Sequence, residues 1–174
     1  MATQKALVLH QFNTKPVFQD YPKPVTKPGQ LLIKIEASTI NPSDRVSMTG
    51  AYLPIPLPAV MGREGVGRIV EANGEQLNEW VGKRVSFWSP LGGAWAEFVA
   101  VDPSMCFPIS EDVPMHSAAS GLVNPLTVIG MTDIFQNTPV RKGIIHTAAA
   151  SALGRQLNKR CIALGIPLLN IVRR

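Results

Sequence analysis

Short runs of strand-forming residues, separated by proline and glycine, dominate the chain up to about Pro108. Proline lacks an amide donor and restricts the residue before it, so the prolines between residues 16 and 28 exclude a helix and predict a loop with an edge strand. The other predicted strands cover residues 6–9, 31–37, 67–71, 82–85 and 94–100. Many short strands with this punctuation predict a closed or partly closed antiparallel barrel.

Beyond Pro114 the pattern changes. Residues 115–132 are rich in small and aliphatic side chains at spacing typical of buried helices, and Asn124-Pro125 predicts that a second helix starts there. The remainder predicts one strand-helix-strand unit, with strands over residues 143–148 and 167–172 and a helix over residues 151–164. The predicted fold class is therefore mixed α/β.

Composition excludes several classes of protein. The 174 residues carry 17 Lys and Arg against 12 Asp and Glu, a formal charge of +5, and 45% of them are hydrophobic, which excludes a disordered chain. The basic residues are scattered, which favours a solvated surface, or a site for small anionic ligands, over a nucleic-acid groove. No apolar run approaches the roughly 18 residues of a membrane span, and residues 1–10 lack a signal-peptide pattern. We expect a cytoplasmic protein that binds neither nucleic acid nor membrane.

Metal-binding patterns are missing from the sequence. Cys106 and Cys161 lie far apart without CxxC spacing, and the histidines at positions 10, 116 and 146 have no cysteine or carboxylate at ligand spacing. We therefore expect no metal site and no disulfide framework.

The turn after the strand over residues 143–148 reads Ala149-Ala150-Ser151-Ala152-Leu153-Gly154. It is the dinucleotide fingerprint G-x-G-x-x-G with Ala and Ser in place of the first two glycines. Small residues let the backbone approach a pyrophosphate, and the following helix offers unpaired amides. The sequence predicts that these six residues bind a dinucleotide.

Arg173 and Arg174 follow the second strand of this unit, where an NAD site would place Asp or Glu against the ribose. A guanidinium can pair with a 2′-phosphate, so the pair favours NADPH over NADH. The alternative is an ordinary basic pair at a chain end.

Four further motifs occur in order before the dinucleotide turn. They are residues 40–44 followed by Gly50, residues 58–67, residues 81–85 and residues 95–98. With the turn, they resemble the medium-chain dehydrogenase/reductases. The resemblance implies a GroES-like domain over residues 1–113, followed by linking helices and a partial, NADP-binding Rossmann domain over residues 114–174. The family's Rossmann sheet has six strands, so the resemblance also implies that this chain is truncated. It further implies that the full-length form can be a homodimer.

Within this family, the zinc-dependent alcohol dehydrogenases have a cysteine in the first motif and Gly-His-Glu in the second. This chain has Asn41 in the first and Gly62-Arg63-Glu64 in the second, so it resembles the zinc-free branch. In that branch it looks most like the mitochondrial-type 2-enoyl thioester reductases, which use NADPH to reduce enoyl-CoA or enoyl-acyl-carrier-protein. A mitochondrial location would require a transit peptide that is not visible here.

The resemblance implies roles for individual residues. Tyr52 matches the catalytic tyrosine, Asn41 orients it or the cofactor, Asp44 caps the local helix, and Asn124 and Thr127 lie beside the nicotinamide. A phenol or amide donor can stabilise the enolate that forms when hydride adds to an enoyl thioester. From the residues alone, Tyr52 reads as an ordinary loop residue, and Asn124 reads equally well as a helix cap.

Two other functions stay open. Quinone and alkenal reductases share the pattern of Asn41 and Asp44 and an alanine-built turn, with the same hydride chemistry. The third possibility is a non-catalytic GroES-like remnant of a reductase.

Overall fold

The computed structural model describes residues 2–52 and 55–173. Its contacts divide the chain into two compact units, Met1–Leu122 and Val123–Arg174. The first unit holds the predicted barrel and the second holds the predicted strand-helix-strand unit.

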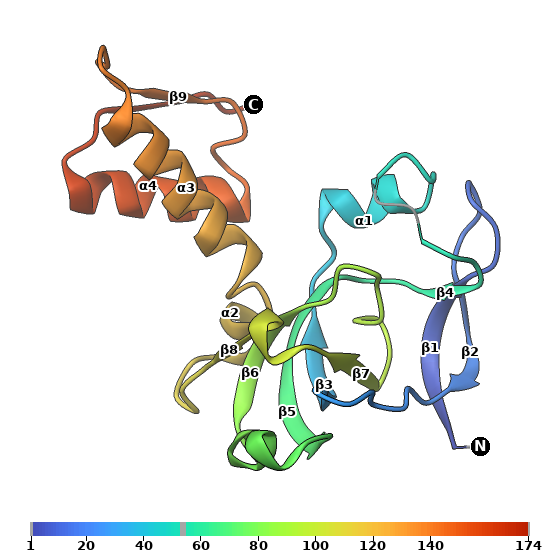
Figure 1. Cartoon of the computed structure of the whole chain (residues 1–174). Helices are drawn as coiled ribbons and strands as arrows, with labels where there is room; N and C mark the ends of the chain where they lie inside the picture. Colours follow the sequence, from blue (N-terminus) through green and yellow to red (C-terminus); the bar gives the residue numbers. More distant parts are fainter. Residues whose placement is uncertain (1, 53–54, 174) are drawn as a thin grey trace. The chain divides into compact units, whose positions relative to one another are not determined.

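A three-stranded antiparallel sheet begins the first unit, with strand order β2-β1-β4 (Figure 1). Its strands are β1 (Thr3–Leu9), β2 (Val17–Pro22) and β4 (Ala59–Val60). Alternate residues of β1 are buried, among them Ala6 and Val8, whereas β2 is mostly exposed. The predicted edge strand among the prolines is thus confirmed as β2, because an edge strand tolerates the missing amide of proline.

A five-stranded antiparallel sheet forms the centre of the first unit, in the order β7-β3-β5-β6-β8. Its strands are β3 (Leu31–Ser38), β5 (Glu64–Ala72), β6 (Arg84–Trp88), β7 (Phe98–Val101) and β8 (Cys106–Pro108). Side chains from four of them build the main core, which includes Leu31, Ile33, Ile69, Val85 and Phe87, each no more than 1% exposed. Burial of this apolar area is the main source of the unit's stability.

The segment before β7 joins the two sheets. Leu7 donates its amide to the Trp95 carbonyl at 2.9 Å, Glu97 donates its amide to the Lys5 carbonyl at 3.2 Å, and the Glu97 carbonyl accepts from Ile35 at 2.8 Å. One short piece of chain therefore pairs with β1 on one side and β3 on the other. This arrangement confirms the predicted partly closed antiparallel barrel.

The described residues of the first unit also form four short helices outside the strands. They are α1 (Pro42–Ser47), α2 (Met115–Ala119) and the 3-10 helices η1 (Glu75–Trp80) and η2 (Pro103–Met105). Helix α2 packs on β5, where Ala118 and Ala119 form a buried cluster with Val66. The Ser86 hydroxyl donates to the Ala118 carbonyl at 2.6 Å, which satisfies one carbonyl at the end of this helix.

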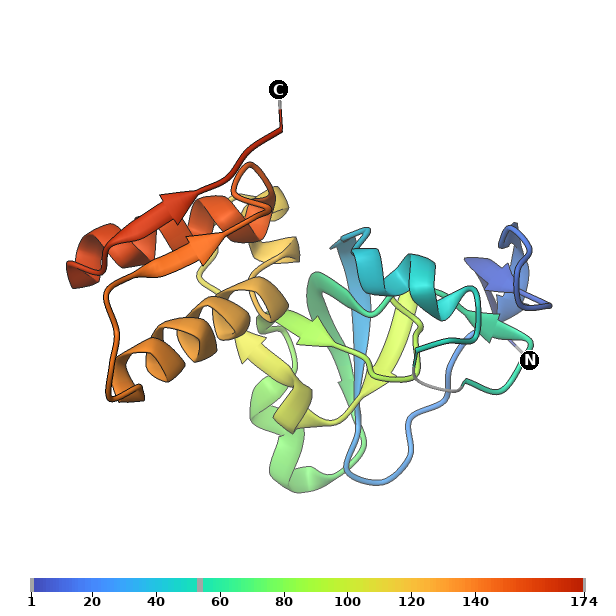
Figure 2. The ribbon, with the colours of Figure 1, turned by 90° about the horizontal axis from the view of Figure 1, so that it is seen from above.

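The second unit is a βαβ unit preceded by a long helix. Its elements are α3 (Val123–Asn137), β9 (Ile144–His146), α4 (Ala152–Leu164) and β10 (Leu168–Asn170). β9 and β10 pair in parallel, and Figures 1 and 2 show both helices on the same side of the two strands. Val128, Leu157, Cys161 and Ile166 form the core between them. Gly165 ends α4 in the left-handed conformation, as predicted.

In the first unit, two predicted strands start later than expected. The strand predicted over residues 82–85 begins at Arg84, because Gly82 turns the chain with a φ of 87°. The strand predicted over residues 94–100 covers only Phe98–Val101 as a regular strand, because the residues before it divide their hydrogen bonds between two sheets. Among the described residues, no helix is long and apolar enough to cross a membrane.

Candidate functional site

The predicted dinucleotide motif forms a turn between β9 and α4. Residues 147–150 make the turn and Ser151 is the N-cap of α4, where its hydroxyl accepts a 3.0 Å hydrogen bond from the Gly154 amide. The side chains of Ala150 and Ser151 are exposed. The exposed residues Ala150 and Ser151 therefore leave the turn open to solvent at the N-terminus of α4.

Gly154 is the one position of the motif that keeps its glycine, and the structure gives the reason. A Cβ on Gly154 would lie 2.5 Å from the Ala149 carbonyl oxygen and 2.6 Å from the Ala148 carbonyl oxygen. Backbone cannot move aside as the end of a flexible side chain can. Glycine at this position lets the first turn of α4 pack against the loop that precedes it.

A cavity of about 350 Å³ opens beside this turn. It is lined by residues 147–151 on one side and by Ile171, Val172 and Arg173 on the other. The structure thus brings Arg173 to the same cavity as the turn, although more than 20 residues separate them in sequence. Arg174 lies outside the described residues.

Arg155 belongs to this region and was not predicted from the sequence. Its Nη1 donates to the Ala150 carbonyl at 3.0 Å, so an exposed guanidinium lies directly against the turn. The signal that could have found it is its place one residue after Gly154, on the first turn of α4.

Asn124 and Thr127 lie on the first turns of α3. Thr127 is exposed, and its hydroxyl donates to the Val123 carbonyl at 2.7 Å within the same helix, while Asn124 is half-buried. Both residues belong to the second unit, whereas Asn41 and Tyr52 belong to the first.

Asn41 is the N-cap of α1 and donates hydrogen bonds to three side chains. Its amide donates to Asp44 Oδ2 at 2.7 Å, and its side-chain Nδ2 donates to Thr39 Oγ1 at 2.9 Å and to Glu64 Oε2 at 3.0 Å. Asp44 therefore caps α1, as predicted. Glu64 is fully buried and also accepts from the Leu122 amide, so Asn41 is one member of a buried polar network.

Asp44 is fully buried despite its charge. Burial raises the pKa of its carboxyl above the ordinary 3.8, against the opposing effects of the Asn41 hydrogen bond and of the nearby Arg63 cation. Its second oxygen, Oδ1, is buried and has no hydrogen-bond partner in the part of the chain that the structure describes.

Arg63 contacts Tyr52, the predicted catalytic tyrosine. The guanidinium carbon of Arg63 lies 5.1 Å from the centroid of the Tyr52 ring, a cation-π distance. Arg63 is only 4% exposed, and its Nη1 donates to the Pro90 carbonyl. Tyr52 is 50% exposed, so the buried Arg63 cation contacts a ring that is accessible to solvent.

Gly62, the residue before Arg63, adopts a backbone conformation that requires glycine. Gly62 has a φ of 80°, and a Cβ there would collide with the indole ring of Trp95. The Trp95 Nε1 donates to the Thr39 carbonyl at 2.9 Å, so this ring is held in place. The motif Gly62-Arg63-Glu64 therefore combines a tight backbone turn with two buried charges.

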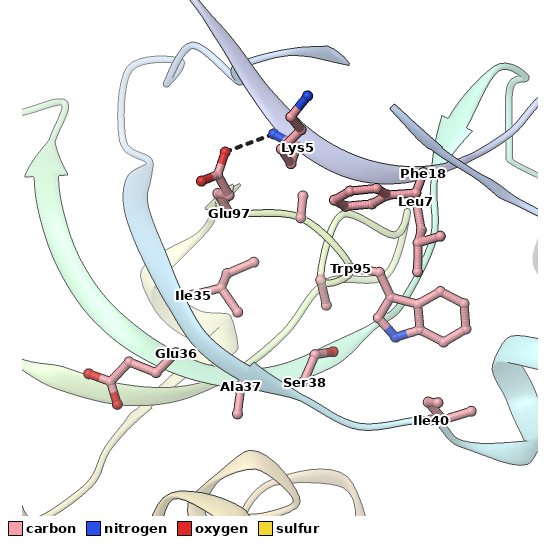
Figure 3. Close-up of a pocket in the computed structure, with 12 residues that line it drawn as sticks. Lys5, Leu7, Phe18, Ile35, Glu36, Ala37, Ser38, Ile40, Trp95 and Glu97 are labelled. Carbon is pink, nitrogen blue, oxygen red and sulfur yellow. Dashed lines mark hydrogen bonds between the residues drawn. The ribbon is translucent and has the colours of Figure 1, made fainter. Parts of the chain in front are cut away.

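A larger cavity, of about 670 Å³, lies between β1, β3 and residues 94–97 (Figure 3). Its wall is mainly apolar and includes Leu7, Ile35 and Trp95, and the Lys5 amide donates to Glu97 Oε2 at 2.7 Å on its rim. None of the residues predicted to act in catalysis or cofactor binding lines this cavity. Within the described residues, no three His, Cys, Asp or Glu side chains gather where they could hold a metal ion.

Most of the barrel matches the model of a known domain family. Residues 27–111 match the alcohol dehydrogenase GroES-like domain. These residues belong to that domain family. The GroES-like domain covers the central sheet and α1, so Asn41, Tyr52 and Arg63 all lie inside it.

Relatives extend this match beyond the GroES-like domain. The chain is 35% identical over 147 residues to a protein of Caenorhabditis elegans named mitochondrial enoyl-[acyl-carrier-protein] reductase, and this alignment covers 83% of the chain and 42% of the relative. A protein of Arabidopsis thaliana with the same name is 32% identical over 153 residues, covering 84% of the chain and 40% of that relative. The chain spans about two fifths of the length of these relatives.

A solved structure gives the same picture. The quinone oxidoreductase of Thermus thermophilus, also studied in complex with NADPH, superposes with a TM-score of 0.82 and 30% identity, over 98% of this chain and 54% of that protein. The predicted resemblance to enoyl thioester reductases and quinone oxidoreductases is confirmed, as is the fold class of a GroES-like barrel with part of a Rossmann domain. The chain is similar to oxidoreductases of this kind.

Proposed function

We propose that these residues contribute the GroES-like domain and the first part of the cofactor domain to an NADPH-dependent, zinc-independent reductase of 2-enoyl thioesters. One observation carries the proposal: the glycine-dependent turn before α4 and Arg173 line one cavity. A pyrophosphate needs close backbone approach, and a 2′-phosphate needs a cation near the end of the second strand. The enoyl-reductase names of the relatives support the substrate class.

The residues of the second unit fit a dinucleotide. The turn over residues 149–154 would hold the pyrophosphate, Arg173 and Arg174 the 2′-phosphate, and Asn124 and Thr127 the nicotinamide. The exposure of Ala150 and Ser151 at the N-terminus of α4, and the cavity that the turn shares with Arg173, support this fit. When bound, NADPH supplies the hydride that adds to the β-carbon of the enoyl thioester and becomes NADP⁺.

The protein's own groups would handle charge and protons. As the β-carbon gains the hydride, electron density moves to the thioester oxygen, and a proton from solution or from Tyr52 reaches the α-carbon to give the saturated thioester. The Tyr52 hydroxyl would donate a hydrogen bond to that oxygen. Asn41, held by Asp44, Thr39 and Glu64, would position the loop that carries Tyr52.

The experiment that tests this proposal begins with a thermal melt, with and without excess NADPH or NADH. A ligand at about 100 times its dissociation constant stabilises the folded state by roughly 2.7 kcal/mol. We expect NADPH to raise the melting temperature and NADH to leave it unchanged. NADPH oxidation with crotonyl-CoA then tests the reaction, in the longest natural form of the protein, and size-exclusion chromatography with light scattering tests the expected homodimer.

A quinone or alkenal reductase is the second candidate, favoured by the likeness to the Thermus thermophilus quinone oxidoreductase. Comparing crotonyl-CoA with a benzoquinone as the acceptor separates the two. NADPH binding with neither acceptor reduced would contradict both, and no response to either dinucleotide would support a GroES-like domain without catalysis.

A further inference from the structure

Arg63 carries an unused hydrogen-bond donor in the interior of the GroES-like domain. Its side chain is 4% exposed, Nη1 donates to the Pro90 carbonyl, and Nη2 is buried without a hydrogen-bond partner among residues 2–52 and 55–173. A buried cationic donor that is left unpaired costs more than an unpaired neutral group. Native proteins rarely keep such a group without a use for it.

The surroundings of Arg63 point to an anionic or strongly polarised partner. Asp44 on α1 attracts the guanidinium electrostatically, but no hydrogen bond joins the two side chains, and Asp44 Oδ1 is itself unpaired. Glu64, the neighbouring carboxylate, is engaged by Asn41, Thr39 and the Leu122 amide. Neither carboxylate therefore accepts a hydrogen bond from Arg63 Nη2.

Tyr52 is the solvent-exposed residue that contacts Arg63. Its ring is 5.1 Å from the guanidinium carbon and half exposed, so a molecule that reaches Tyr52 from solvent also comes next to Arg63.

We propose that Arg63 Nη2 donates a hydrogen bond to the carbonyl oxygen of the substrate, beside Tyr52, and so stabilises the negative charge that develops there. This inference deepens the proposed function and rests on it. Arginine suits the task because its guanidinium stays protonated and planar, and the bond from Nη1 to Pro90 fixes the direction of Nη2. A charge-assisted hydrogen bond of this kind is about twice as strong as a neutral one.

The test uses acetoacetyl-CoA, a thioester that forms an enolate with a characteristic near-ultraviolet absorbance. A donor cation at its oxygen raises the enolate fraction, and no cofactor or turnover is needed. We expect the wild-type protein to increase the enolate absorbance, Arg63→Met to abolish the increase, and Arg63→Lys, which keeps the charge, to retain part of it. An unchanged spectrum with the wild-type protein, or an increase that Arg63→Met preserves, would overturn the proposal.

Arg84→Met is the matched control. Arg84 is also buried, but its donors are satisfied by Glu36 at 3.0 Å and by the Val113 carbonyl at 2.9 Å. We expect this variant to keep the wild-type enolate signal, with a thermal melt to confirm that it folds. If Arg84→Met loses the signal to the same degree as Arg63→Met in the folded protein, the effect is not specific to Nη2 and the proposal is wrong.

Turnover separates this inference from the proposed function. With crotonyl-CoA and NADPH, we expect Arg63→Met to lower kcat/KM by about 100- to 1,000-fold, the usual cost of one donor to a developing oxyanion. An Arg63-dependent enolate signal without NADPH-dependent turnover would contradict the proposed function alone. Wild-type turnover that Arg63→Met leaves within about twofold would contradict the role of Arg63 alone.

Discussion

Gly154 and Ala149 are so close that a Cβ on Gly154 would lie 2.5 Å from the Ala149 carbonyl oxygen. We expect Gly154→Ala to destabilise the second unit by about 1–3 kcal/mol, the usual cost of overpacking, and to abolish the rise in melting temperature with NADPH. Gly130, in the middle of α3, has nothing within 4 Å of its Cβ position. Gly130→Ala should therefore stabilise the protein by about 0.5–1 kcal/mol, because alanine favours the helix. Equal stability of the two variants in urea unfolding would show that the turn is not tightly packed.

Arg173 should decide the preference between the two dinucleotides. We expect Arg173→Ala to weaken NADPH binding by about ten- to one-hundred-fold, the value of one charged hydrogen bond, and to leave NADH binding unchanged. Lys159, an exposed cation on α4 outside the cavity, provides the control, and Lys159→Ala should leave both affinities unchanged. Titration calorimetry measures both. An equal loss of NADPH affinity in the two variants would indicate a general effect of charge.

Asp44 should make the stability of the first unit depend on pH. Burial raises the pKa of its carboxyl above 3.8, so the folded state holds this proton more tightly than the unfolded state does. Its contribution to stability is complete below about that pH and is lost as the pH rises through the folded pKa. We expect Asp44→Asn, which keeps an oxygen for the Asn41 amide, to gain stability relative to wild type between acidic and neutral pH. Melting temperatures across this range measure the difference.

Glu111 should give a pH dependence of stability opposite to that of Asp44, and it serves as the control. Its two oxygens accept from Arg68 at 2.9 and 3.0 Å, and these bonds lower the pKa of the carboxyl below its ordinary 4.5. Its contribution is present above 4.5 and is lost as the pH falls through the folded pKa. Glu111→Gln should therefore lose stability relative to wild type at neutral pH and match it in acid. The same sign for both variants would contradict this assignment.

The two cysteines should be unreactive in the folded protein. Burial raises the pKa of the Cys106 thiol to about 12, with Asp102 adding to the effect, and burial also raises the pKa of Cys161. Because the thiolate is the reactive form, neither thiol should react quickly with Ellman's reagent at about pH 8, and both should react once the protein is unfolded in guanidinium chloride. Rapid reaction of one equivalent in the folded protein would contradict the burial of Cys106.

Local patterns predicted the structure of the turn over residues 149–154 and of the elements that flank it. The strand, the turn and the helix of this motif are adjacent in sequence, so Ser151 as the cap and Gly165 as the end of α4 follow from the identities of the residues. The cap of α1 by Asp44 is equally local, since it depends on residues 41–44 alone. The irregular segment before β7 could not be predicted, because its hydrogen bonds go to strands about 60 and 90 residues away.

The contact between Arg63 and Tyr52 also required the fold. The two residues lie on different segments, Tyr52 after α1 and Arg63 just before β5, and the fold brings the ring to the guanidinium. A signal for Arg63 was nevertheless present: two adjacent charges stand within an apolar, glycine-rich run over residues 60–67, where an exposed strand would alternate. Buried charges in such a run call for partners, and the structure leaves one donor of Arg63 without any in the described part of the chain.

The segment that joins the two sheets affects how the chain folds during synthesis. Lys5 and Glu97 are 92 positions apart, so the edge of β1 that pairs with residues 95–97 has no partner until that segment leaves the ribosome. At about 5–20 residues per second, the wait is roughly 5 to 20 seconds. During that interval, the hairpin of β1 with β2 covers only the opposite edge of β1, so the edge that faces residues 95–97 stays open to pairing with another nascent chain.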